Sequence, residues 1–221
     1  MTIRTIITGA TGMVGEGVLR ECLLDPTVEQ VLVINRKPGG VTHPKLTEII
    51  HADFTNLSAI ESRLRGYNAC FFCLGISSVG VSADDYVRTT YDLTLAFART
   101  MARLNPDMTF CYVSGAGTDS TERGNLRWAR VKGKTENDLL KLPFRRAYMF
   151  RPGFLEPTPD LKNVKSYYRF VSWLIPVVKL FYANAGSTLA ELGRAMIHAA
   201  EQGYDKPVLE VPDIVKAGKL P

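Results

Sequence analysis

Short, unbroken runs of apolar residues alternate along the chain with longer segments in which apolar residues recur every three or four positions. The short runs are typical of parallel strands buried on both faces, and the longer segments of amphipathic helices. The predicted strands are residues 3–8, 31–34, 46–50, 69–74, 109–113 and 146–150. The predicted helices are residues 13–24, 57–64, 82–104 and 126–142. This order predicts an α/β fold with a doubly wound parallel sheet.

The pattern changes after Gly153. Prolines and Asn163 mark a loop, residues 167–181 are aromatic and apolar, residues 187–201 form an amphipathic helical pattern, and residues 208–211 resemble a last strand. We therefore predict a main domain over residues 1–155. Residues 156–221 are expected to be a small C-terminal segment that packs on this domain and covers a substrate cleft.

Three glycines spaced three apart join the first strand to the first helix. A glycine in this position allows a tight turn, a second allows backbone to approach a pyrophosphate, and a third allows the helix to pack on the strand. The helix N-terminus then offers N–H groups and a partial positive charge to phosphates. The motif predicts a Rossmann-type dinucleotide site, and the alternative is a tight turn that binds nothing. The predicted contacts are Gly9, Thr11, Gly12, Met13, Val14 and Gly15.

Ligands of such sheets bind beyond the carboxyl ends of the strands, so residues that follow the strands are expected to meet in one cleft. Besides the glycine turn, the cofactor contacts predicted there are Asp53, Phe54, Leu74, Gly75, Pro152 and Gly153. Asp53 has two interpretations: it accepts a hydrogen bond from an adenine amine, or it caps the next helix.

The residues after the second predicted strand indicate which cofactor is bound. NAD-binding proteins normally have an acidic residue here, which binds the ribose hydroxyls. This chain has Asn35, followed by Arg36 and Lys37. An arginine binds a 2′-phosphate with its planar fork, so we predict NADP(H) in preference to NAD(H). The alternative is that Arg36 and Lys37 are solvated charges on a loop.

These motifs, together with Ser114 after the fifth strand and Arg151-Pro152-Gly153 after the sixth, resemble the short-chain dehydrogenase/reductase superfamily. The resemblance is closest to its extended and atypical branches, the NAD-dependent epimerase/dehydratase-like proteins. It covers residues 1–155 well and the remainder loosely. The motifs are specific to the superfamily but not to one reaction.

The resemblance also implies catalytic residues. In the superfamily a serine orients the substrate oxygen, a tyrosine transfers a proton, and a lysine four residues later holds the nicotinamide ribose and lowers the tyrosine pKa. Ser114 and Lys132 match the serine and the lysine, and Lys132 is also a predicted cofactor contact. Trp128 occupies the tyrosine position, and its indole supplies no proton at usable pH. The candidate replacements for the acid are Tyr91, Tyr167 or a water.

Two functions follow from these residues. The first is an NADP(H)-dependent oxidoreductase that acts on a small carbonyl or alcohol, enclosed by the aromatic segment around Tyr167, Tyr168, Trp173 and Phe181. The second is a non-catalytic NADP(H)-binding redox sensor or regulator, favoured by Trp128. In that case the segment at residues 170–180 forms a partner or homodimer surface instead of a lid.

Composition limits the other classes. The chain has 221 residues, 46% of them hydrophobic, and a net charge of +5. Its basic residues are scattered, which argues against nucleic-acid binding. Residues three apart on a strand point to opposite faces, so Cys70 and Cys73 are expected to be separate buried thiols. The histidines, His43, His51 and His198, are too dispersed for a metal site. With no export signal and no apolar span, we expect a cytoplasmic protein.

Overall fold

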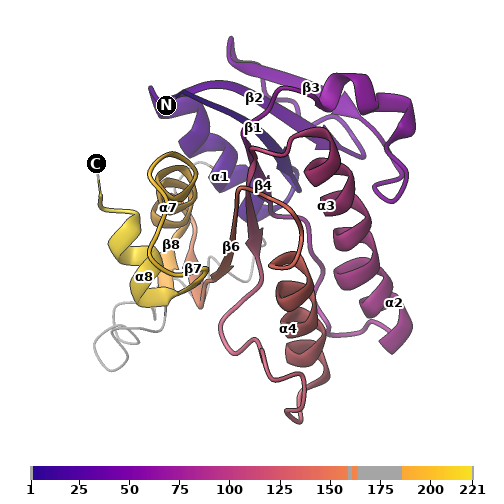
Figure 1. Ribbon diagram of the computed structural model, residues 1–221. Helices are drawn as coiled ribbons and strands as arrows, with labels where there is room; N and C mark the ends of the chain where they lie inside the picture. Colours follow the sequence, from indigo (N-terminus) through magenta and orange to yellow (C-terminus); the bar gives the residue numbers. More distant parts are fainter. Residues whose placement is uncertain (1, 159–160, 164–185, 221) are drawn as a thin grey trace.

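The computed structural model describes residues 2–158, 161–163 and 186–220, and its centre is a parallel sheet of seven strands (Figure 1). The strand order is β3-β2-β1-β4-β5-β6-β9. The strands are β1 Ile3–Thr8, β2 Val28–Asn35, β3 Leu46–Ile50, β4 Ala69–Phe72, β5 Thr109–Val113, β6 Arg146–Arg151 and β9 Val208–Glu210. The predicted doubly wound Rossmann-type sheet is confirmed.

Helices cover both faces of this sheet (Figure 1). The bounds are α1 Met13–Leu24, the 3₁₀ helix η1 Ser58–Leu64, α2 Ala83–Val87, the π-turn η2 Arg88–Asp92, α3 Leu93–Leu104, α4 Arg127–Leu139, α7 Leu189–Glu201 and α8 Val211–Ala217. The face of α1, α7 and α8 has one hydrophobic core, with Val18, Leu192 and Ile214 in it. The face of η1, α3 and α4 has the second core, with Leu64, Phe97 and Leu139.

Most predicted elements are present, and the differences at their ends have local causes. Strand β2 begins at Val28 rather than at residue 31, because Val28 pairs with Ile3 of β1 despite the polar residues that follow it. Strand β4 ends at Phe72 rather than at residue 74, because Phe72 pairs with Thr8, the last residue of β1. The expected cap of the long helix is confirmed, since the Asp85 N–H donates to the Ser82 hydroxyl.

The C-terminal part contributes directly to the main sheet. Strand β9 pairs with β6, and α7 packs against α1. The predicted helix at residues 187–201 begins at Leu189, because Thr188 and Glu191 form a capping box. The preceding residues form β8 Gly186–Thr188, which pairs with β7 Phe154–Glu156. Neither this small parallel sheet nor α8 was predicted, and the division of the chain at residue 155 stays a prediction.

The four cysteines are free. Cys70 packs in the core beneath α3, while Cys73 packs against the core beneath α1, so the two lie on opposite faces as predicted. Burial raises the pKa of the Cys73 thiol to about 12.

The sheet places a binding cleft at the ends of β1 and β4. The chain leaves β1 toward β2 on one side, and later returns to β4 on the other side. Helices on opposite faces diverge at such a switch point and leave a crevice beyond the carboxyl ends of the strands. The aromatic segment at residues 167–181, including Tyr167, Tyr168, Trp173 and Phe181, lies outside the described residues.

Candidate cofactor-binding and active site

Two glycines of the turn after β1 are required by its geometry. Gly9 has a φ of +73°, and a Cβ there would lie 2.8 Å from the carbonyl oxygen of Cys73, which directly follows the neighbouring strand β4. A Cβ on Gly15 would lie 2.2 Å from the carbonyl oxygen of Gly9. The Gly12 N–H donates to this same oxygen at 2.9 Å. The turn is therefore closed by backbone atoms, without room for side chains at Gly9 or Gly15.

Helix α1 begins directly after this turn, and no side chain caps its N-terminus at Gly12. The first-turn N–H groups, from Met13 onward, carry the partial positive charge of the helix end. The predicted contacts Met13, Val14 and Gly15 belong to the first turn of α1 and do not line the pocket described next. An uncapped helix N-terminus above a glycine turn is the arrangement that fits a pyrophosphate.

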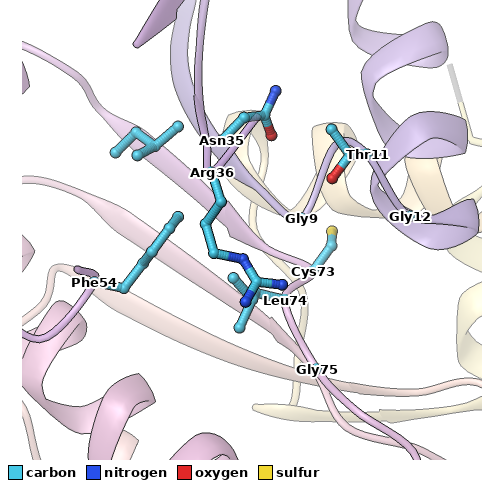
Figure 2. Close-up of a pocket in the computed structure, with 10 residues that line it drawn as sticks. Gly9, Thr11, Gly12, Asn35, Arg36, Phe54, Cys73, Leu74 and Gly75 are labelled. Atoms are coloured by element: carbon cyan, nitrogen blue, oxygen red, sulfur yellow. The ribbon is translucent and has the colours of Figure 1, made fainter. Parts of the chain in front are cut away.

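A pocket of about 220 Å³ opens beside the turn (Figure 2). The predicted contacts that line it are Gly9, Thr11, Gly12, Arg36, Phe54, Leu74 and Gly75. Ile34, Asn35 and Cys73 complete the lining. The Arg36 side chain lies across the pocket, between Phe54 and the glycine turn (Figure 2). The ends of β1, β2 and β4 thus form one cavity, as expected of residues that follow parallel strands.

A second hollow, of about 550 Å³, adjoins the first and shares Thr11 and Arg36 with it. Its other lining residues are Lys37, Pro38, Gly39 and Asn163. Glu16, in the first turn of α1, positions Asn163: its two carboxylate oxygens accept the backbone N–H groups of Lys162 and Asn163, each at 2.8 Å. Arg36 and Lys37 make this hollow cationic.

Asp53 makes local contacts. Its carboxylate accepts the backbone N–H and the hydroxyl of Thr55, at 2.9 and 2.6 Å. These bonds hold the pKa of the Asp53 carboxyl below its usual value. The residue is exposed and lines neither pocket, so the adenine contact stays a prediction. The interpretation as a helix cap is wrong, because the N-cap of η1 is Leu57 and no side chain caps that helix.

The loop after β5 lies beside the predicted Pro152 and Gly153. The Ala116 N–H donates to the Pro152 carbonyl, and the Ser114 N–H donates to the Phe150 carbonyl, both at 2.8 Å. The Ser114 side chain is buried and donates to the Glu136 carboxylate on α4. Its hydroxyl is thereby directed into the protein.

Glu136 is the centre of a buried polar cluster. The Arg151 guanidinium of β6 bonds the Glu136 carboxylate, and it reaches Glu210 at 3.0 Å. A buried carboxylate is tolerated only when it is paired and hydrogen-bonded. This cluster fixes α4, and with it Lys132, against the ends of β5 and β6.

Lys132 lies one helical turn before Glu136 and extends to the same loop. Its ammonium group donates to the backbone carbonyl of Ser114. Burial lowers the pKa of Lys132 to about 8, although the Glu136 carboxylate opposes this change. A lysine with this pKa changes its charge close to physiological pH.

Trp128 lies four residues before Lys132 on α4, where the resemblance implies a tyrosine. Its ring lies against the loop after β5, since a Cβ on Gly117 would be 3.5 Å from the ring. Tyr91 is not placed to substitute, because its hydroxyl donates to Asp138 and the Lys134 ammonium lies over its ring. Lys134 and Asp138 are displaced from Lys132 and Glu136 by two residues each, which points them away from the loop.

This geometry agrees with comparisons to known proteins. The model of the NAD dependent epimerase/dehydratase family matches residues 5–124, more than half of the chain. The chain belongs to this family. It is therefore related to the NAD(P)-binding short-chain dehydrogenases/reductases.

Relatives from fungi and a mammal resemble this epimerase/dehydratase chain over much of its length. "Protein FMP52-1, mitochondrial" of Scheffersomyces stipitis is 25% identical over 212 residues, which cover 90% of this chain and 89% of that protein. "Protein HTATIP2" of Rattus norvegicus is 28% identical over 151 residues, covering 67% of this chain and 61% of that protein.

Solved structures share the fold of this family member. The Bordetella bronchiseptica enzyme WbmF in complex with NAD⁺ has a TM-score of 0.63 at 14% identity, covering 97% of this chain and 77% of that one. Glucuronic acid dehydrogenase from Chromohalobacter salexigens has a TM-score of 0.65 at 15% identity, covering 95% of this chain and 76% of that one.

The cytoplasmic location expected from the sequence is contradicted by these comparisons. The FMP52 relatives from Scheffersomyces stipitis and Emericella nidulans are named mitochondrial. Free cysteines by themselves do not identify a compartment, which is why the composition misled. Within the described ranges, no helix is both long and apolar enough to cross a bilayer. Across those same residues, no group of His, Cys, Asp and Glu side chains is placed to hold a metal.

Several residues of the family cleft were not predicted as contacts. Ile34 and Asn35 are the last two residues of β2, and Cys73 directly follows β4. All three lie close to predicted contacts, so a wider strand-end rule would have included them. Asn163 has no such signal, because it lies near the cleft through tertiary contacts such as the bond of its backbone N–H to Glu16. Glu136 and Arg151 join the site through tertiary contacts alone.

Proposed function

We propose that the protein is an NADP(H)-dependent oxidoreductase of the short-chain type, which acts on a small carbonyl or alcohol. The observation that carries this proposal is the position of Arg36, which lines both the pocket at the glycine turn and the cationic hollow beside it. A dinucleotide with its pyrophosphate at α1 would extend its adenosine ribose toward this junction. A 2′-phosphate would then be bound by Arg36 and Lys37.

The remaining residues fit the nicotinamide end of such a cofactor. Bound NADPH would supply a hydride to a carbonyl, and bound NADP⁺ would accept one from an alcohol. Lys132, held by the Ser114 carbonyl, would donate hydrogen bonds to the ribose hydroxyls and place positive charge where substrate oxygen becomes negative. The buried Ser114 hydroxyl orients this loop through Glu136. Trp128 bounds the substrate space, and the proton is supplied by Lys132 itself or by a water that it positions.

The cofactor preference is tested by calorimetric titration of NADPH and NADH into the wild-type protein and the Arg36→Gln variant. Glutamine retains much of the length of the side chain but removes the charge. We expect NADPH affinity to fall by about 10- to 100-fold, the loss of a charge-assisted hydrogen bond. NADH affinity should change less than about threefold. Wild-type protein that binds NADH as tightly as NADPH would contradict the preference.

A non-catalytic redox sensor is the second candidate, and two observations favour it. Trp128 stands where the proton donor is expected, and the Ser114 hydroxyl is directed to Glu136 rather than to the cleft. A sensor must bind NADPH and NADP⁺ with different affinity, because equal binding shifts no equilibrium. Unequal affinities, with no turnover across panels of carbonyls and alcohols, would support the sensor. Turnover of any panel member would support the enzyme.

A further inference from the structure

One carboxylate oxygen joins the two ends of the cationic segment. Glu48 Oε1 accepts a hydrogen bond from the Asn35 side-chain amide at 2.7 Å. The same oxygen accepts the backbone N–H of Gly39 at 2.9 Å. Arg36 and Lys37 lie between these two donors. The segment is therefore a short bridge whose two ends are attached to a single atom.

Glu48 is well placed to hold this bridge firmly. It lies within β3 and pairs in register with Val33 of β2. Its neighbour Ile49 is buried in the core, so the strand that carries the carboxylate is anchored. Asn35 is also fixed, because it is buried and its carbonyl accepts the His51 N–H at 2.8 Å. A carboxylate acceptor makes stronger bonds to N–H donors than a neutral oxygen does.

The bridge is held at the border of the two pockets. A Cβ on Gly39 would lie 3.2 Å from Glu48 Oε1, 3.3 Å from the Asn35 amide nitrogen and 3.9 Å from the Thr11 methyl group. Thr11 belongs to the glycine turn and lines both pockets. The two hydrogen bonds to Glu48 therefore hold the start of the β2–β3 connection against the glycine turn.

We propose that Glu48 is a positioning residue for cofactor choice: it holds residues 35–39 so that Arg36 and Lys37 face the site of the 2′-phosphate. This proposal rests on the proposed NADP(H) function. Arg36 and Lys37 on a flexible segment would lose conformational entropy when they bind a phosphate. A segment that is already ordered in the free protein reduces this cost. Glu48 acts through Arg36 and Lys37 and does not itself contact the phosphate, which its charge would repel.

The test compares Glu48→Ala with Glu48→Gln in the full-length protein. Alanine removes the acceptor, whereas the glutamine amide oxygen accepts the same two bonds. The calorimetric probes are NADPH, NADH and adenosine 2′-monophosphate, which isolates the phosphate. Glu29→Ala is the matched control, because Glu29 is an exposed acid near the other end of β2. Thermal unfolding of each variant verifies that it is folded.

We expect Glu48→Ala to lower the affinities for NADPH and adenosine 2′-monophosphate by about tenfold. This is the effect of losing roughly one net hydrogen-bond contribution. The affinity for NADH should change by less than about threefold, since NADH has no phosphate at this site. Glu48→Gln and Glu29→Ala should both keep the wild-type ratio of NADH to NADPH dissociation constants within about threefold. A purely structural role for Glu48 would lower the melting temperature without changing this ratio.

Two results would overturn the proposed role of Glu48 without affecting the proposed NADP(H) function. In the first, Glu48→Ala keeps the wild-type ratio of NADH to NADPH dissociation constants. In the second, Glu48→Gln loses this ratio as fully as Glu48→Ala does. Wild-type protein that binds NADPH and NADH equally overturns the proposed NADP(H) preference, and this proposal with it. The wild-type titration therefore separates the two failures.

Discussion

Trp128 stands where the family resemblance implies a tyrosine, four residues before Lys132. The bond of Lys132 to the Ser114 carbonyl holds that lysine in place. Indole donates a hydrogen bond but does not transfer its proton at usable pH. Its ring lies against Gly117 in the loop after β5, the loop that begins at Ser114. Substitution of this side chain therefore tests the choice between the two proposed functions.

We expect Trp128→Tyr to raise carbonyl-dependent oxidation of NADPH by at least about tenfold, since a positioned general acid typically contributes about 10²- to 10⁴-fold. The lowered pKa of a phenol beside the Lys132 ammonium is the physical reason. Trp128→Phe is the control, because it opens similar space without a proton donor. Equal rates for the tyrosine and phenylalanine variants would refute a phenol-dependent step at this position.

Lys132 provides a pH-dependent prediction. Burial lowers its pKa to about 8, so in the free protein it is charged below this pH and neutral above it. Cofactor affinity should therefore fall as pH rises through about 8, because the neutral amine loses its attraction for the anionic cofactor. The measurement is NADPH affinity from pH 6.5 to 9.5.

Two variants separate Lys132 from other titrating groups. Lys132→Met should give weaker binding with no decrease near pH 8, and Lys132→Arg should keep its affinity to higher pH because guanidinium stays charged. A decrease near pH 8 that persists in Lys132→Met would assign it to a different group.

At the scale of elements, the junction of β1 and α1 is set by backbone contacts. A Cβ on Gly15 would meet the Gly9 carbonyl at 2.2 Å, whereas a Cβ on Gly12 would have its nearest neighbour at 3.4 Å. Backbone atoms of a buried strand end cannot move aside as a flexible side chain does. Gly15 is therefore required by the close approach of α1 to the turn, whereas Gly12 is not required for packing. The spacing of the glycines in the sequence does not reveal this difference.

Gly15→Ala should destabilise the protein by about 1–3 kcal/mol, as overpacking usually does. For a chain of this size that lowers the melting temperature by roughly 2–10 °C. Gly12→Ala should change the melting temperature little, because it makes only an ordinary contact. Thermal unfolding of both variants makes the comparison. A Gly15→Ala variant as stable as Gly12→Ala would show that α1 can shift away from β1.

The long helix on the other face shows a second element-level feature. The predicted helix at residues 82–104 is continuous, but its middle is the π-turn η2, which packs against α4. Periodicity does not reveal one extra residue in a turn, because apolar positions recur at similar spacing on either side. The contact with α4 is tertiary, and it includes the bond from Tyr91 to Asp138.

At the scale of the whole molecule, the cofactor site connects parts of the chain that are far apart. The ends of β1, β2 and β4 line one pocket, and the adjoining hollow includes Asn163. A ligand that binds only the folded state should therefore stabilise the molecule as a unit.

At a free NADPH concentration of 100 times its dissociation constant, this linkage amounts to about 2.7 kcal/mol. We expect a rise in melting temperature of roughly 5–10 °C, measured by differential scanning fluorimetry. The Arg36→Gln variant should show a smaller rise at the same concentration. An equal rise in both proteins would place the bound nucleotide away from Arg36.

The sequence by itself determined the succession of strands and helices that build the main parallel sheet, and the place of the pocket at its strand ends, but it did not reveal β7, β8 or α8. These follow from local properties: unbroken apolar runs, helical periodicity and a glycine turn whose backbone contacts involve residues 9–15. Residues at the ends of parallel strands meet because the topology requires it, so Gly9, Arg36 and Gly75 could be placed in one cleft in advance.

Only the tertiary structure decided which polar groups pair. Glu48 bonds Asn35 from a neighbouring strand, Glu136 directs the Ser114 hydroxyl inward, and Glu16 holds the backbone at Asn163. Each pairing joins residues with no regular spacing between them, and each depends on side-chain positions set by packing. A carboxylate in a sequence has many potential donors, and the fold decides which of them come within hydrogen-bond distance.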